Sequence, residues 1–124
     1  MAMNNDEMSL NDMNYVDRVV LCGSNSYDKK YYLNPQFNML PDQVKEDIKI
    51  ICVLFTEEVG GLFRMEFNEE GDLELVTEAA EEDILYDEIG AGLLVKEIQK
   101  NRKELFEELT LFYRVIFFGE EMPD

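Results

Sequence analysis

Apolar and polar residues alternate with two different periods along the chain, and the changes of period divide it into strands and helices. Residues 16–22 form a β-branched run, residues 23–26 are Gly, Ser and Asn, and residues 27–33 form a second run of strand composition. Two such runs around a short polar loop predict a β-hairpin. A break at Pro35 follows the second strand.

Residues 41–59 change to a helical period. Their apolar side chains recur at spacings of three and four, Pro41 suits a first helical turn, and glycines at positions 60 and 61 end the pattern. These features predict a helix over residues 41–59. Residues 48–55 are also rich in β-branched and aromatic side chains, so a buried strand is the alternative for that part. The helical face would consist of Val44, Ile48, Ile51, Cys52, Phe55 and Val59.

Residues 62–67 and 72–77 alternate between apolar and polar side chains and predict a second hairpin. Gly71 stands in its connection, where a left-handed residue closes a turn. After an acidic linker, apolar residues at spacings of three, four and seven predict one long helix over residues 87–118, with Gly119 at its C-terminal cap.

The element order ββαββα predicts an α+β fold. We expect a two-layer sandwich in which a four-stranded, mainly antiparallel sheet carries two helices on one face. Residues 1–14 are rich in Asn, Asp and Met without a sustained period, so we expect a disordered tail there. The remaining residues, 15–124, have the length of a single domain.

The charge of the chain excludes several classes of partner. Its 124 residues include 28 Asp and Glu but 11 Lys and Arg, which gives a formal net charge of -17. Such a surface repels nucleic acid and anionic membranes, because both require cationic contacts. No apolar run approaches the roughly 20 residues of a membrane-spanning helix, and the first residues lack the pattern of a signal peptide. We therefore expect a cytoplasmic protein.

The common catalytic signatures are missing from the sequence. The chain has no histidine, which removes the commonest general base, zinc ligand and triad member. Cys22 and Cys52 are expected to be reduced, buried hydrophobic residues. Gly90 and Gly92 lack the strand-turn-helix frame and the third glycine of a dinucleotide-binding loop. We expect a protein that is not an enzyme and that carries neither a cofactor nor a metal.

Eleven acidic residues and no Lys or Arg lie between Met65 and Val95. A calcium site is one interpretation of this acidic block, but residues 68–72 do not fit the EF-hand loop. A solvated acidic face is a second interpretation, and recognition of a basic protein is a third. For the third interpretation we expect the partner-binding residues to be Glu81, Glu82, Asp83, Asp87 and Glu88.

The end of the last predicted helix has almost no polar face. Its aromatic side chains either pack within the chain's own core or form an interface between two copies, since large exposed apolar patches are rare on monomers. In the second case the protein is a homodimer, and the self-association residues are Phe112, Tyr113, Phe117 and Phe118.

Three runs between Leu40 and Gly119 resemble those of a known family. They are LPDQVKEDIKIICVLFTEEVGG, LYDEIG and ELFEELTLFYRVIFFGE. The family is an uncharacterised group of short acidic proteins from clostridia-type gut bacteria, known as a domain of unknown function. The resemblance implies a cytoplasmic bacterial protein, and it supplies no activity, cofactor or catalytic residue.

The sequence favours a non-enzymatic protein-interaction module with an acidic binding surface around the second hairpin and the linker that follows it. Its partner would be an unknown basic protein. The alternative is a small-molecule or cation-binding protein. In that case the pocket would lie between sheet and helices, near carboxylates, and would be lined by Tyr27, Tyr31 and Tyr32.

Overall fold

The computed structural model describes residues 18–120, so the predicted tail over residues 1–14 lies outside the described part of the chain. The described residues form an α+β fold with four strands, three α-helices and one short 3-10 turn. In chain order the elements are β1 (Val19–Asn25), β2 (Lys30–Leu33), the turn η2 (Pro35–Phe37), α1 (Asp42–Val59), β3 (Leu62–Phe67), β4 (Leu73–Glu78), α2 (Glu88–Asn101) and α3 (Lys103–Phe118).

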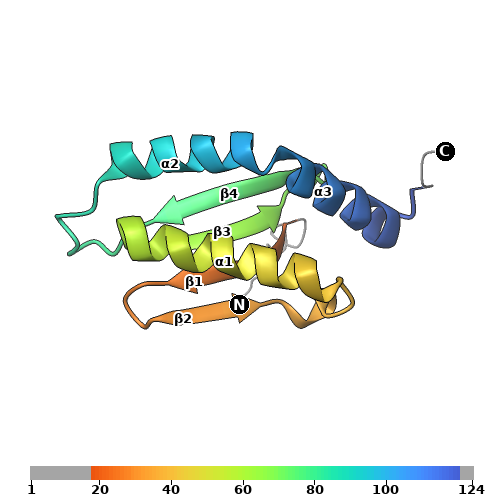
Figure 1. Ribbon diagram of the computed structural model, residues 1–124, viewed down its shortest axis with the longest axis horizontal. Coiled ribbons are helices and arrows are strands. Elements are labelled where there is room, and N and C mark those ends of the chain that lie inside the picture. Colours follow the sequence, from red (N-terminus) through yellow and green to blue (C-terminus); the bar gives the residue numbers. More distant parts are fainter. Residues whose placement is uncertain (1–17, 121–124) are drawn as a thin grey trace, which may run out of the picture.

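The strands form one antiparallel sheet in the order β2-β1-β3-β4, so the two hairpins meet at β1 and β3 in its centre (Figure 1). Alternation along β3 directs Phe63, Met65 and Phe67 to one face of the sheet. These three side chains are 1%, 0% and 1% exposed. One face of the sheet therefore belongs to the core, as the predicted second hairpin required.

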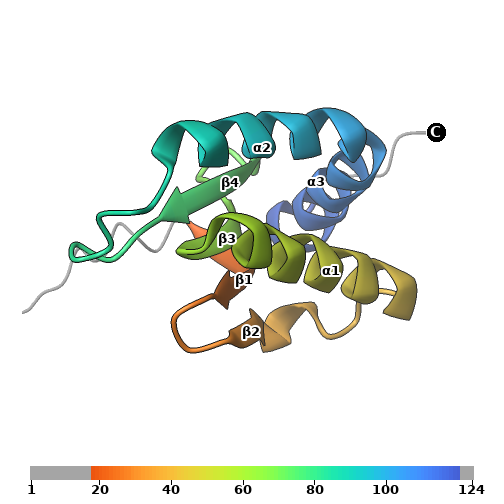
Figure 2. The same cartoon turned by 60° about the vertical axis from the view of Figure 1, so that its left-hand side comes forward.

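The helices pack against this buried face. α1 contacts β1, β2 and β3, whereas α2 and α3 contact β4. Figures 1 and 2 show α1 and α2 running in opposite directions, with the end of α1 and the start of α2 at the same end of the molecule. Cys22 and Cys52 lie between sheet and helix, fully buried, with their Sγ atoms 3.5 Å apart. Their predicted burial is confirmed.

Residues 42–59 are helical, and the alternative of a strand over residues 48–55 is wrong. The buried side chains of this stretch lie along one stripe of α1, because their spacings of three and four match the helical period. Burial of that stripe against the sheet outweighs the strand propensity of the individual residues. No helix in the part of the chain described, residues 18–120, has the length and apolar content that a membrane span needs.

The single helix predicted over residues 87–118 is wrong, because the chain breaks at Arg102 into α2 and α3. Arg102 has φ −117° and ψ 30°, and its guanidinium lies 3.3 Å from the Asp47 carboxylate on α1. A continuous helix of that length would span about 48 Å, whereas a strand as short as β4 spans about 20 Å. The break lets both helices pack against β4. Neither Gly nor Pro marks it in the sequence.

The first hairpin turns later than predicted. β1 continues through Asn25, and the turn comprises residues 26–29. The Asn25 side-chain oxygen accepts hydrogen bonds from the backbone N–H groups of Tyr27 and Asp28, so this residue ends the strand and builds the turn. Gly23 lies within β1. A Cβ at this position would lie 2.9 Å from the Phe63 carbonyl oxygen, so the strand requires glycine here.

Candidate interaction surface

The acidic block of the sequence divides into two parts in the structure. In the first part, Arg18 and Arg64 pair with the carboxylates of β3 and β4. Arg18 and Arg64 both bind the Glu66 carboxylate, at 2.7 and 2.6 Å. Arg18 also pairs with Glu74. Arg64 also pairs with Glu78, at 3.2 Å. The strands of the second hairpin are therefore a poor place for a cationic partner to bind.

Glu66 lies on the sheet face that the helices leave uncovered, because it alternates with Met65 along β3. Its side chain is 7% exposed. Burial would raise the pKa of this carboxyl, but hydrogen bonds and charge from Arg64 and Arg18 outweigh that effect and hold the pKa below its ordinary value. Glu66 therefore stays ionised at neutral pH and serves the sheet.

The second part of the acidic block, residues 81–88, has no Lys or Arg partner within residues 18–120. Glu81, Glu82 and Glu88 are exposed. None of the three forms an ion pair with another described residue. These three of the five predicted partner-binding residues are thus available to a partner.

The other two predicted partner-binding residues, Asp83 and Asp87, have roles within the chain. Asp83 accepts a hydrogen bond from the Tyr27 hydroxyl at 2.6 Å. Asp87 is the N-terminal cap of α2 and accepts a hydrogen bond from the Gly90 N–H at 3.0 Å. Both bonds hold the connection between β4 and α2, which we call the 79–87 loop.

Tyr86 fixes the 79–87 loop to the sheet. Its hydroxyl shares a hydrogen bond with the Thr77 hydroxyl on β4. Its ring lies against Gly61, where a Cβ would approach the ring to 2.7 Å. Gly61 also has φ 72°, a conformation that only glycine adopts without strain. Tyr86 therefore attaches the loop both to the connection between α1 and β3 and to β4.

Large apolar side chains project from this attached loop and from the start of α2. Ile84 and Leu85 are 87% and 90% exposed, and Ile89 is 78% exposed. A group of apolar side chains this exposed is typical of an interaction site. These three residues are not among the predicted contacts, because in the run EEDILYDEI the charge of the acids is the more obvious signal in the sequence. We call the combined feature the acidic–apolar surface, which comprises Glu81, Glu82, Ile84, Leu85, Glu88 and Ile89.

A groove of about 430 Å³ lies between α1 and α2. On α1 its wall includes Ile50 and Leu54, which are 43% and 57% exposed. On α2 the wall includes Leu94 and Ile98, which are half-buried against the core. We call this feature the α1–α2 groove, and the carboxylates that line it belong to Glu58 and Glu97.

The last turn of α1 carries two exposed carboxylates, Glu57 and Glu58, and no basic residue. A helix C-terminus carries partial negative charge, so carboxylates there are destabilising and cations are preferred. Lys96, Lys100 and Lys103 lie toward the other end of α2 and at the start of α3. Because α1 and α2 run in opposite directions (Figure 1), Glu57 and Glu58 in the last turn of α1 and Glu88 in the first turn of α2 lie at the end of the molecule that holds the 79–87 loop.

The aromatic side chains of α3 are divided between the core and the surface. Tyr113 is 3% exposed and stacks on Phe67, with ring centroids 4.1 Å apart. Phe112 packs partly buried against the core. Phe117 stacks on Tyr113 and is 36% exposed, and Phe118 is 45% exposed. Of the four predicted self-association residues, Tyr113 therefore serves the chain's own core, and the last two leave apolar surface outside it.

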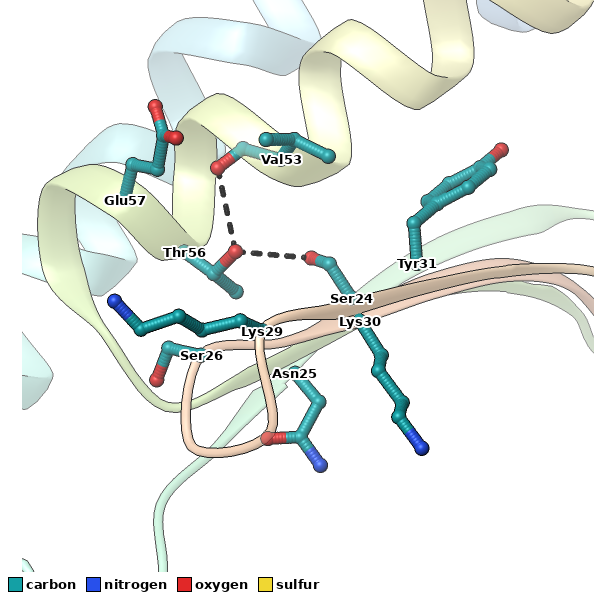
Figure 3. Close-up of a pocket in the computed structure, with 9 residues that line it drawn as sticks. All are labelled: Ser24, Asn25, Ser26, Lys29, Lys30, Tyr31, Val53, Thr56 and Glu57. Atoms are coloured by element: carbon teal, nitrogen blue, oxygen red, sulfur yellow. Dashed lines mark hydrogen bonds between the residues drawn. The ribbon is translucent and has the colours of Figure 1, made fainter.

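A pocket of about 380 Å³ lies between the β1–β2 hairpin and α1 (Figure 3). This is the region where the sequence predicted a small-molecule site. Tyr31 lines the pocket. The Tyr27 hydroxyl is instead hydrogen-bonded to Asp83. Tyr32 is 54% exposed on the opposite face of the sheet. The structure thus brings one of the three predicted tyrosines to the pocket.

Two of the hydroxyl groups in that pocket are engaged within the chain. The Ser24 hydroxyl donates to the Cys52 carbonyl oxygen at 2.7 Å, and the Thr56 hydroxyl lies 3.2 Å from the Ser24 hydroxyl and 3.3 Å from the Val53 carbonyl oxygen (Figure 3). The Tyr31 hydroxyl is buried without a hydrogen-bond partner among the described residues. Among residues 18–120, no group of three or more Cys, Asp and Glu side chains is placed to hold a metal ion.

A family model described as a family of unknown function (DUF6145) matches residues 18–121. The chain belongs to this family. The predicted resemblance to an uncharacterised domain is thereby confirmed, and the clostridial origin that it implied stays a prediction. The match extends from β1 to the end of α3, so the acidic–apolar surface and the α1–α2 groove both lie in the family's domain. Neither a curated protein nor a solved structure matches the chain.

Proposed function

We propose that the chain is a protein-interaction module whose acidic–apolar surface binds a basic segment of another protein. The observation that carries this proposal is the exposure of three large apolar side chains among carboxylates. They are Ile84 and Leu85 on the 79–87 loop and Ile89 at the start of α2. Contact with a partner would remove these side chains from water, which is favourable by about 25 cal/mol per Å² of apolar area. The same contact would leave the core of the module unchanged.

The charges around these side chains select the partner. Glu81, Glu82 and Glu88 are exposed, and no described Lys or Arg neutralises them. A partner with Lys or Arg beside its own apolar side chains fits both features, whereas an acidic partner is repelled. Added salt would weaken the charged contacts and leave the apolar contacts in place.

A binding role is favoured over catalysis by two further observations. The sequence has no histidine. The Ser24 and Thr56 hydroxyl groups of the 380 Å³ pocket between the first hairpin and α1 are engaged in bonds within the chain. For the end of α3 we propose a second copy of the chain as the partner, because Ile116, Phe117 and Phe118 are 53%, 36% and 45% exposed there. The homodimer would leave the acidic–apolar surface free.

The charge part of the proposal is tested with a fluorescein-labelled peptide of Leu and Lys, with Leu on one helical face, followed by fluorescence anisotropy. The double variant Glu81→Lys/Glu82→Lys is compared with Glu107→Lys/Glu108→Lys, which has the same net charge and alters exposed residues of α3. We expect the first variant to raise Kd about tenfold, which corresponds to about 1.4 kcal/mol, and the second to have a much smaller effect. Equal effects of the two variants would mean that the peptide senses only net charge.

The apolar part is tested with Ile84→Ser/Leu85→Ser against Met39→Ser. Met39 is 59% exposed and lies before α1, outside the acidic–apolar surface. We expect the loop variant to weaken peptide binding in both low and high salt, because the lost contact is apolar. The Met39 variant should bind as the unaltered protein does. If the loop variant also binds unchanged, these side chains are not the anchors and the proposed function is wrong.

A further inference from the structure

We propose that the α1–α2 groove receives one amphipathic helix of the basic partner. This inference rests on the proposed function and names the form in which the partner binds. The groove lies beside the acidic–apolar surface, because α1 ends and α2 begins at the end of the molecule that holds the 79–87 loop (Figures 1 and 2). A single partner segment can therefore contact both.

The spacing of the groove side chains fits a helix. Ile50 and Leu54 are four residues apart on α1, and Leu94 and Ile98 are four residues apart on α2. Side chains four residues apart lie along one ridge of a helix, with about 5–6 Å between their Cβ atoms. The ridges of a third helix fit between two such rows. The groove of about 430 Å³ leaves room for the side chains of such a ridge.

An extended peptide fits this groove less well. A bound strand needs backbone hydrogen bonds from a sheet edge, and the walls of the groove are two helices, α1 and α2, whose backbone groups bond within each helix. A helix satisfies its own backbone groups and presents only side chains. The groove walls therefore favour an occupant that is already helical.

The charges around the groove indicate which residues should flank the apolar face of the partner helix. Glu58 and Glu97 line the groove, and Glu57 is exposed in the same last turn of α1. The cation in the groove wall, Arg102, is paired with Asp47 at 3.3 Å. An apolar stripe flanked by Lys or Arg complements this arrangement. The stretch from Ile50 to Glu58 covers about 12 Å, which a partner helix of about three turns spans.

The experiment uses the full chain and three labelled peptides of equal length. The first has Leu on one helical face and Lys elsewhere, the second has the same composition with Leu spread around the helix, and the third has Glu in place of Lys. The groove variant is Ile50→Gln/Leu54→Gln, since glutamine keeps helix propensity at these exposed positions. The loop variant Ile84→Ser/Leu85→Ser is measured in parallel. Thermal melting shows whether the groove variant stays folded. If the double variant does not fold, the single variant Leu54→Gln is used in its place.

We expect the first peptide to bind at least tenfold more tightly than the other two. We also expect the groove variant to lose at least tenfold in affinity, and backbone amide signals of residues along α1 and α2 to shift in NMR spectra when the first peptide binds. If the loop variant loses affinity and the groove variant binds unchanged, the groove inference is overturned and the proposed function stands. If neither variant changes binding, both are overturned.

Discussion

The Tyr27 hydroxyl donates a hydrogen bond of 2.6 Å to the carboxylate of Asp83, 56 residues later in the chain. The same hydroxyl accepts a hydrogen bond from the Ala80 N–H at 3.1 Å. One side chain of the β1–β2 turn thus holds two points of the 79–87 loop. This loop presents Ile84 and Leu85 to solvent, so the bond couples the first hairpin to the proposed binding surface.

Replacing Tyr27 by Phe should loosen the 79–87 loop without unfolding the protein. The variant removes both hydrogen bonds of the hydroxyl and keeps the ring. We expect faster amide hydrogen exchange at Ala80 and in the residues around Asp83, with a nearly unchanged melting temperature. Tyr32→Phe is the control, because that ring is 54% exposed on the opposite face of the sheet. Unchanged exchange in the Tyr27 variant would show that the loop is held by other contacts.

The same bond has a defined pH dependence. The hydrogen bond to Asp83 raises the pKa of Tyr27 above its ordinary value of 10.0. A raised pKa in the folded state means that the contribution of the bond to stability is fully present below pH 10 and is lost as pH rises through the folded-state pKa. Ultraviolet titration of the unaltered protein should therefore show a tyrosine that ionises above pH 10.0. The same ionisation should be missing in Tyr27→Phe, and the difference between the two titrations assigns it to Tyr27.

Replacing Glu66 by Gln should destabilise the sheet and weaken its response to acid. The carboxylate bonds both Arg18 and Arg64, and its loss leaves two arginines without their shared partner. We expect a loss of about 2 kcal/mol in the free energy of unfolding, near the value for charge-assisted hydrogen bonds, since both arginines are about one-third exposed. Urea unfolding at neutral pH measures this change.

The acid response follows from the lowered pKa of Glu66. A lowered pKa in the folded state contributes stability that is present above the ordinary pKa of 4.5 and is lost as pH falls through the folded-state pKa. The difference in unfolding free energy between the unaltered protein and Glu66→Gln should therefore shrink below about pH 4.5. Glu69→Gln, an exposed carboxyl of the β3–β4 connection, should show no such difference. A difference that persists unchanged into acid would contradict this role of Glu66.

Two glycine substitutions should have opposite signs. Gly61→Ala puts a Cβ 2.5 Å from the Glu78 carbonyl oxygen and 2.7 Å from the Tyr86 ring, at φ 72°. We expect it to cost about 1–3 kcal/mol and to detach Tyr86. Gly92→Ala meets no atom within 4 Å in α2, and we expect it to stabilise by about 0.5–1 kcal/mol. Thermal melting of the two variants measures both signs. A stabilising Gly61→Ala would show that the close packing of Tyr86 is not required.

The aromatic residues of α3 should separate folding from self-association. Tyr113→Ala removes a ring stacked in the core, and we expect it to cost about 3–5 kcal/mol. Phe118→Ser alters a ring that is 45% exposed, so its melting temperature should change little. If the end of α3 joins two copies, light scattering should show that Phe118→Ser shifts the protein from dimer to monomer. A monomer in the unaltered protein at high concentration would remove the self-association proposal.

Local patterns were sufficient to predict most of the elements. Phe63, Met65 and Phe67 alternate with polar residues, and a hairpin that buries one face follows directly from that period. The helical stripe of α1 was equally visible in the sequence. The break at Arg102 was not visible in the sequence, because it depends on the length of the sheet and on the ion pair of Arg102 with Asp47 on another helix. Length mismatch between elements is a tertiary property that periodicity within one segment does not contain.

The candidate site was predicted only in part, because it too depends on contacts between distant segments of the chain. Acid content alone pointed to residues 81–88, and four exposed carboxylates are found there, those of Glu81, Glu82, Asp87 and Glu88. The pairing of Glu66 and Glu74 depends in part on Arg18, which is 48 residues from Glu66 in sequence. The Tyr27 hydroxyl, on another hairpin, holds Asp83, the residue next to the exposed Ile84 and Leu85. Long-range contacts of this kind appear only when the chain is folded.

The lysines of α1 and α2 lie toward one end of the molecule, and this uneven placement contributes to an electric moment along its length. Glu57 and Glu58 stand at one end, and Lys96, Lys100 and Lys103 lie toward the other. In the field of a cationic object, such a body rotates before any surfaces touch, so it arrives with its negative pole leading. Lysines that never reach the partner would then govern the speed of encounter and leave the lifetime of the complex unaltered.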